Sequence, residues 1–219
     1  MSAVIERSPG PSPSRDCPVC PRLVAFRGAN RQAAPDWHNA PVPSFGPADA
    51  RLLVVGLAPG LKGANRTGRP FTGDYAGDLL YGTLKKFGFA AGSYDRRPDD
   101  GFNLIGCRIT NAVRCVPPEN KPTPAEIAAC RPFLAGEIAG LPRLRAILAL
   151  GSIAHGSVLA ALGERPSRRP FKHGALHALE GGLLLADSYH CSRYNTNTGR
   201  LTPAMFEAVF AAVAARIGG

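Results

Sequence analysis

The sequence lacks any apolar run near the roughly 20 residues that a helix needs to cross a bilayer. Its opening stretch, MSAVIERSPGPSPSRD, also lacks the apolar segment of a secretory signal. We therefore expect a cytoplasmic protein that makes no contact with a membrane. Disulfides are rare in that compartment, so the six cysteines are available for metal binding or for the core.

Acidic residues are scarce: 16 Asp and Glu stand against 26 Lys and Arg, which gives a net charge of +10. A basic excess of this size favours a polyanionic partner such as nucleic acid. On charge alone, an arginine-rich protein without such a partner fits equally well. Without any internal repeat, the chain fits a disordered segment over residues 1–16 and one domain over residues 17–219. We expect a monomer.

Four apolar runs, rich in β-branched residues and leucine, predict buried strands within residues 51–56, 102–113, 144–150 and 182–186. Helical patterns follow Cys20 and cover residues 74–87, 124–138, 152–162 and 202–217. Strands that alternate with helices indicate βαβ units. The pattern therefore predicts an α/β fold with a four-stranded, mostly parallel sheet covered on both faces.

Polar and glycine-rich groups come directly after these strands. Gly56-Leu-Ala-Pro-Gly60 follows the first strand, Asn111 ends the second, and His190 follows the fourth. Ligands of open α/β sheets bind at the carboxyl edge, where these groups would meet. This convergence is stronger than the signal of any single residue.

Residues 110–130, TNAVRCVPPENKPTPAEIAAC, place two amides, Asn111 and Asn120, on the same proline-stiffened loop as Cys115 and Cys130. With the pair in Cys17-Pro-Val-Cys20, these thiols form a set of four whose spacing suits zinc and an iron–sulfur cluster equally. The two remaining cysteines are Cys107, which we expect to be a small core residue, and Cys191, which stays unassigned.

Four motifs occur in order: GLAPG, GRPFTGDYAG, ITNAVRCVPPENKPTPAEIAAC and SYHCSRYN. Together they resemble the iron–sulfur uracil-DNA glycosylases, and the GLAPG form is similar to the family-5 branch. The resemblance covers roughly residues 15–205. It implies a three-layer α/β/α sandwich and a [4Fe–4S] cluster held by Cys17, Cys20, Cys115 and Cys130.

The resemblance also implies a pocket for a uracil flipped out of DNA, formed by Gly56, Ala58, Gly60, Phe71 and Asn111. Phe71 would stack on the base and Asn111 would bind its Watson–Crick edge. His190 would donate to the base as negative charge develops on it. The plainer alternatives are a core phenylalanine, a turn-capping asparagine and a surface histidine.

One position departs from the best-known uracil-DNA glycosylases, in which the first motif carries a carboxylate that positions water. Ala58 stands there in this chain. Asp74 is the nearest acid and Asn120 a second polar candidate, so the predicted catalytic set is Asp74, His190 and Asn120. Asp74 is equally suited to be the N-cap of the helix that follows it.

For contacts with DNA, the sequence predicts a basic loop that includes Arg168, Arg169, Lys172 and His173. His173 and His177 have the spacing of a metal pair on a helix, but Pro170 and Gly174 argue against a helix there. From the resemblance, Arg193, Tyr194 and Asn195 would enter the DNA groove beside the flipped base.

The interpretation that joins these features is a monofunctional DNA glycosylase. It would release uracil from double- or single-stranded DNA and leave an abasic site, and the family-5 resemblance extends this to other deaminated bases. None of the four motifs places a lysine to act as a Schiff-base nucleophile. The alternatives are a non-catalytic nucleic-acid binding module with a zinc site and a Rossmann-type enzyme, although GxGxxG is missing after the first strand.

Overall fold

The computed structural model describes residues 12–218. The expected disordered segment over residues 1–16 therefore falls largely outside the described residues. Its last residues run beside α1 (Pro21–Ala33), where Arg31 Nη1 donates to Asp16 Oδ1 at 2.7 Å.

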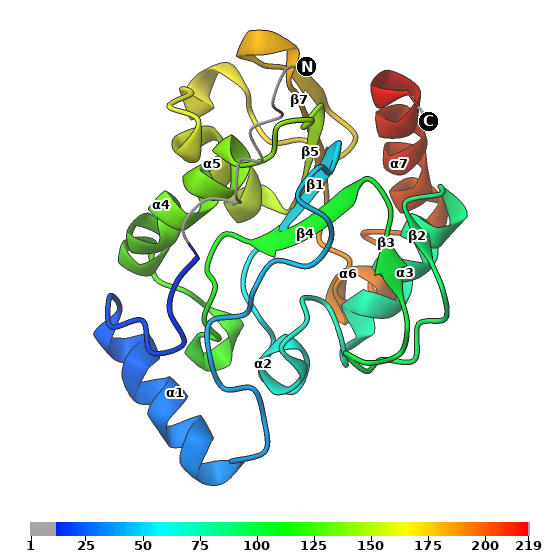
Figure 1. Ribbon diagram of the computed structural model, residues 1–219. Coiled ribbons are helices and arrows are strands. Elements are labelled where there is room, and N and C mark those ends of the chain that lie inside the picture. Colours follow the sequence, from blue (N-terminus) through cyan, green and yellow to red (C-terminus); the bar gives the residue numbers. More distant parts are fainter. Residues whose placement is uncertain (1–11, 219) are drawn as a thin grey trace, which may run out of the picture.

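A five-stranded sheet in the order β4-β1-β5-β7-β6 forms the centre of the molecule (Figure 1). Four strands are parallel, and β6 is antiparallel to β7 at one edge. The bounds are β1 (Leu52–Gly56), β4 (Cys107–Asn111), β5 (Ala146–Leu150), β6 (Leu176–Ala178) and β7 (Leu184–Ser188). Every residue of β1, β5 and β7 is buried, which explains why these strands have continuous apolar sequences.

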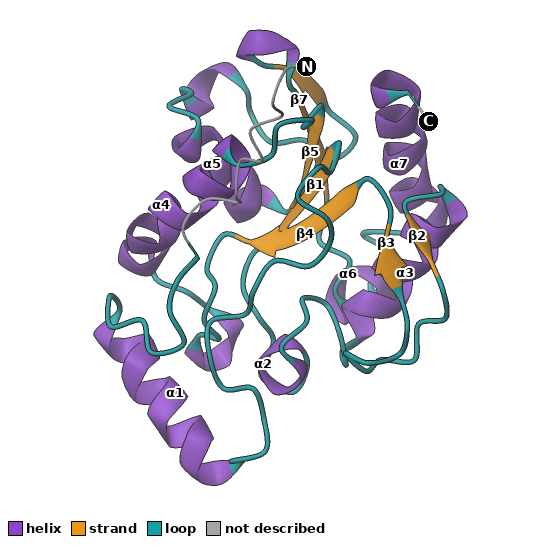
Figure 2. Ribbon diagram, viewed as in Figure 1, coloured by secondary structure: helices purple, strands orange, loops and turns teal. Residues whose placement is uncertain are grey.

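Helices cover both faces of this sheet, as Figures 1 and 2 show. Leu52 and Val54 of β1 pack in one core with α3 (Tyr75–Lys86) and α7 (Pro203–Ile217). Leu53 and Val55 pack in a second core with α4 (Pro124–Ala139) and α5 (Ser152–Ala161). Successive residues of a strand point to opposite faces, so this alternation confirms the predicted three-layer α/β/α sandwich.

The sheet has five strands, and the prediction of four was wrong in this detail. The missed strand, β6, has only three residues and one aliphatic side chain at its start, too little for a recognisable pattern. The predicted strand within residues 102–113 is two strands, because the chain turns at Gly106 with φ +59°. Its first part, β3 (Asn103–Leu104), pairs with β2 (Ala90–Ala91) in a separate small sheet.

The remaining elements are short: α2 (Ala64–Thr67), α6 (Arg193–Asn197) and the 3₁₀ turns η1 (Pro118–Asn120), η2 (Pro166–Arg168) and η3 (Glu180–Gly182). None of the helices in residues 12–218 combines the length and the apolar character needed to span a membrane.

The sequence Thr123-Pro-Ala-Glu126 has the pattern of a capping box, and the structure contains one at the start of α4. Thr123 Oγ1 accepts from the backbone nitrogen of Glu126 at 3.3 Å, and Glu126 Oε2 accepts from that of Thr123 at 2.8 Å. Both carboxylate oxygens of Glu126 also accept from Arg22 on α1, at 2.8 and 2.7 Å. This bidentate contact fixes α1 beside the start of α4.

Candidate active site and cysteine cavity

A cavity of about 690 Å³ opens at the carboxyl ends of the parallel strands, within the usual size range of small-ligand sites. The loop after β1, the end of β4 and the loop after β7 all contribute to its wall. The lining residues are Leu57, Ala58, Pro59, Gly60, Leu61, Lys62, Gly63, Ala64, Phe71, Asp74, Tyr75, Ala76, Asn111, Asn120, His190, Ser192 and Arg193. The fold therefore brings together Ala58, Gly60, Phe71, Asp74, Asn111, Asn120 and His190 from the predicted pocket.

Gly56 lies directly beneath this wall, at the end of β1 and opposite Asn111 of β4. A Cβ atom at Gly56 would lie 2.6 Å from Phe71 Cζ and would overlap Asn111 Oδ1. Only glycine lets both side chains approach the strand end, so Gly56 shapes the cavity without lining it.

Asn111 is 4% exposed, and within residues 12–218 its Oδ1 has no hydrogen-bond partner. A buried acceptor left unpaired costs free energy, and such atoms are uncommon unless they have a functional role. The amide of Asn111 is thus available for a ligand. Beyond it, the ladder with β1 continues, since Ala112 N donates to Gly56 O and Val113 N to Leu57 O, each at 2.9 Å.

Phe71 combines both interpretations that its sequence allowed. Its ring contributes to the core on the α3 side of the sheet and also lines the cavity. It stacks on the imidazole of His190 with ring centroids 5.8 Å apart and planes 28° apart. The backbone of Phe71 is left-handed, with φ +53°.

His190 is half-buried, and burial lowers its pKa to about 4. At neutral pH the ring is therefore uncharged and carries one N–H donor. Asn195 Nδ2 donates to the backbone oxygen of His190 at 2.8 Å and fixes the loop that carries it. Asn195 is thus a structural support here, in addition to any contact with DNA.

The two carboxylate oxygens of Asp74 have different surroundings. One oxygen, Oδ1, accepts from Gly77 N at 3.2 Å and caps α3, as the plainer interpretation predicted. The other, Oδ2, lies over the glycine loop, where a Cβ at Gly63 would lie 2.5 Å from it. Burial raises the pKa of Asp74, against backbone hydrogen bonds from Gly77 and Ala76 that lower it.

Asn120, the other candidate for handling water, is exposed on η1 with φ +57° and reaches the cavity wall. Arg193 also reaches the wall, and its guanidinium carbon lies 5.2 Å from the ring centroid of Tyr75. The neighbouring Tyr194 is 72% exposed. An exposed aromatic beside a basic side chain suits contact with stacked bases and phosphates.

Only some side chains of the predicted basic loop are exposed to solvent. Lys172 and Arg168 are exposed, whereas Arg169 donates to Ala178 O at 3.0 Å and lies 3.3 Å from Glu164. His173 turns inward, stacks on Tyr189 with ring centroids 4.8 Å apart, and accepts from Tyr189 N at 3.1 Å.

A buried polar cluster supports this region, and the sequence interpretation missed it. Asp187 contacts His155 Nδ1 at 2.7 Å and His177 Nε2 at 2.9 Å, while His155 Nε2 lies 2.8 Å from Arg169 O. The available signal was an acid inside the apolar run of β7, LLADS, which a buried strand accepts only with partners.

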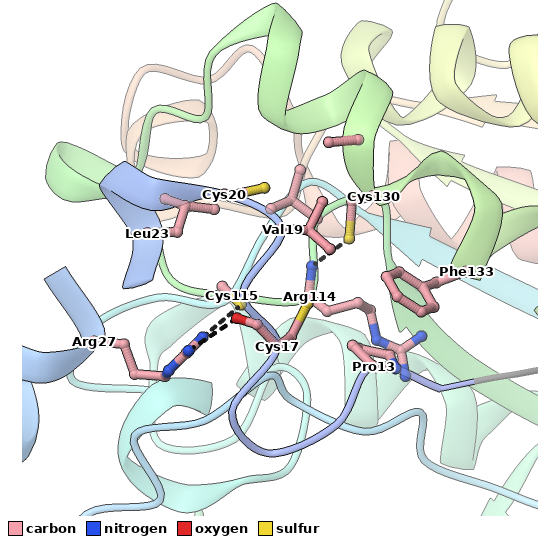
Figure 3. A pocket seen from close by; sticks show the side chains of 12 residues that line it. Pro13, Cys17, Val19, Cys20, Leu23, Arg27, Arg114, Cys115, Cys130 and Phe133 are labelled. Carbon is pink, nitrogen blue, oxygen red and sulfur yellow. Dashed lines mark hydrogen bonds between the residues drawn. The ribbon is translucent and has the colours of Figure 1, made fainter. Parts of the chain in front are cut away.

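The four predicted metal ligands also come together. Cys17, Cys20, Cys115 and Cys130 line a single cavity between α1, α4 and the loop after β4 (Figure 3). None of the six cysteines forms a disulfide. Cys107, as predicted, and Cys191 are both fully buried in the core that packs against α3 and α7.

The surroundings of this cysteine cavity suit anionic sulfur. Arg27 Nη1 lies 3.7 Å from Cys115 Sγ, and Arg114 N donates to Cys130 Sγ at 3.4 Å. Burial raises the pKa of the Cys115 thiol to about 11, so this thiol becomes a thiolate only when a cation offsets the burial. A four-thiol donor set with N–H groups aimed at sulfur fits a thiolate-bound metal or cluster.

Comparison with known proteins shows the family to which the chain belongs. The family model described as the uracil DNA glycosylase superfamily matches residues 43–214. A type-5 uracil-DNA glycosylase of Thermus thermophilus is 50% identical over 196 residues, which cover 87% of this chain and 89% of that relative. Relatives with the same description from Mycobacterium leprae (44% identical, 89% and 88% covered) and Pyrobaculum aerophilum (40%, 93% and 90%) are also similar.

Proposed function

Because the chain belongs to the uracil-DNA glycosylase superfamily, we propose that the cavity at the strand ends is its pocket for a base flipped out of DNA. The protein is a uracil-DNA glycosylase, a DNA repair enzyme that hydrolyses N-glycosyl bonds. The observation that carries the pocket assignment is the unpaired, buried Oδ1 of Asn111 beside the ring of Phe71 in one cavity. The non-catalytic module with a zinc site is not favoured.

In this pocket the ring of Phe71 offers a π-face to the base. The amide of Asn111 has an acceptor for the N3–H of uracil and a donor for a neighbouring carbonyl. Cytosine has no proton on N3 and carries an amino group on its Watson–Crick edge, so it fits the same amide poorly. Ala58 and Gly60 line the cavity with little or no side chain, and Gly56 leaves room beneath the wall for Phe71 and Asn111.

The departing base carries negative charge, and His190 is the donor proposed to stabilise it. Its imidazole is neutral at physiological pH, so its N–H provides a hydrogen bond without an accompanying imidazolium charge. Asp74 Oδ2 is the proposed base for the attacking water, and it also favours an oxocarbenium-like sugar. Asn120 is the second candidate for orienting that water.

The cysteine cavity is proposed to hold a [4Fe–4S] cluster through Cys17, Cys20, Cys115 and Cys130. Its donor set, the N–H groups near sulfur and the family support this assignment. When bound, the cluster links α1 to α4 and to the loop after Asn111, and its role is structural. Hydrolysis of the N-glycosidic bond needs no electron transfer.

DNA is proposed to lie across the cavity mouth, near Arg193, Tyr194 and Asn195 and the exposed Lys172, with His173 behind it. The net charge of +10 supports binding to phosphates. We further propose a monomer, a cytoplasmic location, a single glycosylase domain over residues 17–219, and activity on other deaminated bases.

A uracil-containing oligonucleotide tests the pocket assignment directly. We expect single-turnover release of uracil and an intact strand with an abasic site, without added metal. Asn111→Ala and Phe71→Ala should both slow release far more than they weaken affinity for undamaged duplex. Release at the normal rate by both variants would reject this pocket.

A further inference from the structure

Phe71 has a backbone conformation that bulky residues rarely adopt. Five non-glycine residues among positions 12–218 have positive φ, and Phe71, at φ +53°, is the one aromatic residue among them: Asn39, Phe71, Arg96, Glu119 and Asn120. Such a strained conformation persists only where surrounding contacts determine it, and it is concentrated at functional sites. The contacts that hold Phe71 are therefore informative.

Two tyrosines, the buried Tyr81 and the half-buried Tyr94, bond to the backbone carbonyls before and after the φ torsion of Phe71. Tyr81 donates its hydroxyl to Pro70 O, and Tyr94 donates its hydroxyl to Phe71 O at 3.1 Å. Burial raises the pKa of Tyr94 to about 12, so its hydroxyl keeps the proton that it donates. Gly77 leaves room for this arrangement, because a Cβ there would overlap both Phe71 O and Tyr94 Oη.

A buried arginine fixes the two tyrosines. Arg69 is 5% exposed, and its Nη1 and Nη2 donate to the two oxygens of Asp100, each at 2.8 Å. Its guanidinium carbon lies 5.5 Å from the ring centroid of Tyr81 and 5.7 Å from that of Tyr94, which favours cation–π attraction. Through Nε it also donates to Thr72 Oγ1 at 2.7 Å, directly after Phe71.

We propose that Tyr94, supported by Tyr81 and Arg69, is a positioning residue of the base pocket. It holds Phe71 in the left-handed conformation, so that the ring faces the cavity and His190 before a base arrives. In the described part of the chain, none of the three residues lines the cavity, so their proposed effect on a bound base is indirect, through the position of Phe71. The inference rests on the proposed role of Phe71 in stacking on the base. Its benefit is preorganisation, because a fixed ring loses no freedom when the base binds.

Tyr94→Phe removes the hydroxyl and keeps the ring beside Arg69. We expect single-turnover release of uracil to slow by about five- to tenfold, the effect of one lost neutral hydrogen bond. Affinity for undamaged duplex should not change. The matched control is Phe87→Leu, which thins the aromatic contact with Phe210 in the same core, 6.1 Å between ring centroids; among the described residues, Phe87 stacks on neither Tyr81 nor Tyr94. An equal slowing in both variants at equal melting temperatures would overturn the proposal.

A double-mutant cycle separates positioning from general stability. If Tyr94 acts through the Phe71 ring, Tyr94→Phe should slow release less than about twofold in a Phe71→Ala background. The same slowing in both backgrounds would reject the positioning role and leave the pocket assignment intact. Release at the normal rate by Phe71→Ala alone would reject the stacking role of Phe71 and, with it, this inference; the pocket assignment is rejected only if Asn111→Ala also releases uracil at the normal rate.

Discussion

The cysteine cavity and the base pocket share β4 and the loop after it, yet they are built in opposite ways. The cysteine cavity takes the same side chain from three segments, and its neighbours are ordinary helix and loop residues. The base pocket takes a different side chain from each strand end and depends on glycines and a left-handed phenylalanine.

This difference predicts that substitutions in the two regions have different effects. Atoms of the cysteine cavity join distant parts of the chain, so a lost thiol should weaken the fold. Side chains of the base pocket line a cavity, and two of them, Phe71 and Asn120, have left-handed backbone. Changes there should slow the reaction and leave the fold nearly intact.

The largest effect should follow from Cys115→Ser. We expect loss of most of the iron and a melting temperature lower by about 10 °C or more, because a metal site that links segments contributes to folding directly. Iron and sulfide analysis with a thermal melt measures this. Cys107→Ala, in the core away from the cavity, should keep its iron. Zinc in place of iron in protein made without oxygen would contradict the cluster.

A smaller effect, confined to chemistry, should follow from Asn111→Ala or His190→Ala. Each should slow single-turnover release by roughly 10²–10³-fold, the scale for one lost donor to a developing anion. Iron content and melting temperature should stay near those of the unmodified protein. A large drop in melting temperature in these variants would erase the contrast between the two regions.

Asp74→Asn separates an effect on stability from an effect on the reaction at a single residue. Asparagine caps a helix about as well as aspartate, so stability should hold, while release slows at least about tenfold through loss of the base. Burial raises the pKa of Asp74, so acid should slow the unmodified enzyme as Asp74 takes up a proton. The rate of the variant should lack this acidic limb. Normal cleavage by the variant would reduce Asp74 to a cap.

The smallest effect concerns stability against pH. The pKa of His190 is about 4 in the folded chain and 6.5 in the unfolded chain, so its contribution to stability is complete above pH 6.5. As pH falls from 6.5 to about 4, the unfolded state binds a proton that the native state does not, and the free energy of unfolding decreases. Urea unfolding at several pH values should show a shallower decrease in His190→Gln. Identical slopes would contradict a half-buried imidazole that stays neutral.

Much of the fold follows from local pattern. The continuous apolar runs of β1 and β5 and the capping box of Thr123 and Glu126 were sufficient to place those elements. The meeting of residues 56–60, Asn111 and His190 followed from a general rule, since strand ends in a parallel sheet meet at one edge. The family resemblance was needed to add Phe71. The four cysteines were recognisable because thiols with that spacing are typical metal ligands where disulfides are not expected.

What escaped prediction depends on contacts between residues far apart in sequence. The strand predicted within residues 182–186 ended before Asp187, because no neighbouring residue in the sequence indicates that His155 pairs with it inside the fold. His173 appeared to be a surface cation, yet its ring packs on Tyr189. The hydroxyl of Tyr94 gains its meaning only from the turn that brings it to Phe71 O.

The backbone hydrogen bonds between β1 and β4 continue past the end of β4, so two backbone amides there report on the structure of both regions. Ala112 N and Val113 N bond to the strand-end loop that borders the base pocket, and Cys115 follows two residues later. Oxidative damage at the sulfur atoms would loosen this segment first, so these amides should exchange with deuterium early while Leu148, inside β5, stays protected. Hydrogen exchange could thus measure how far a structural change at the oxidised cysteines extends toward the proposed uracil pocket.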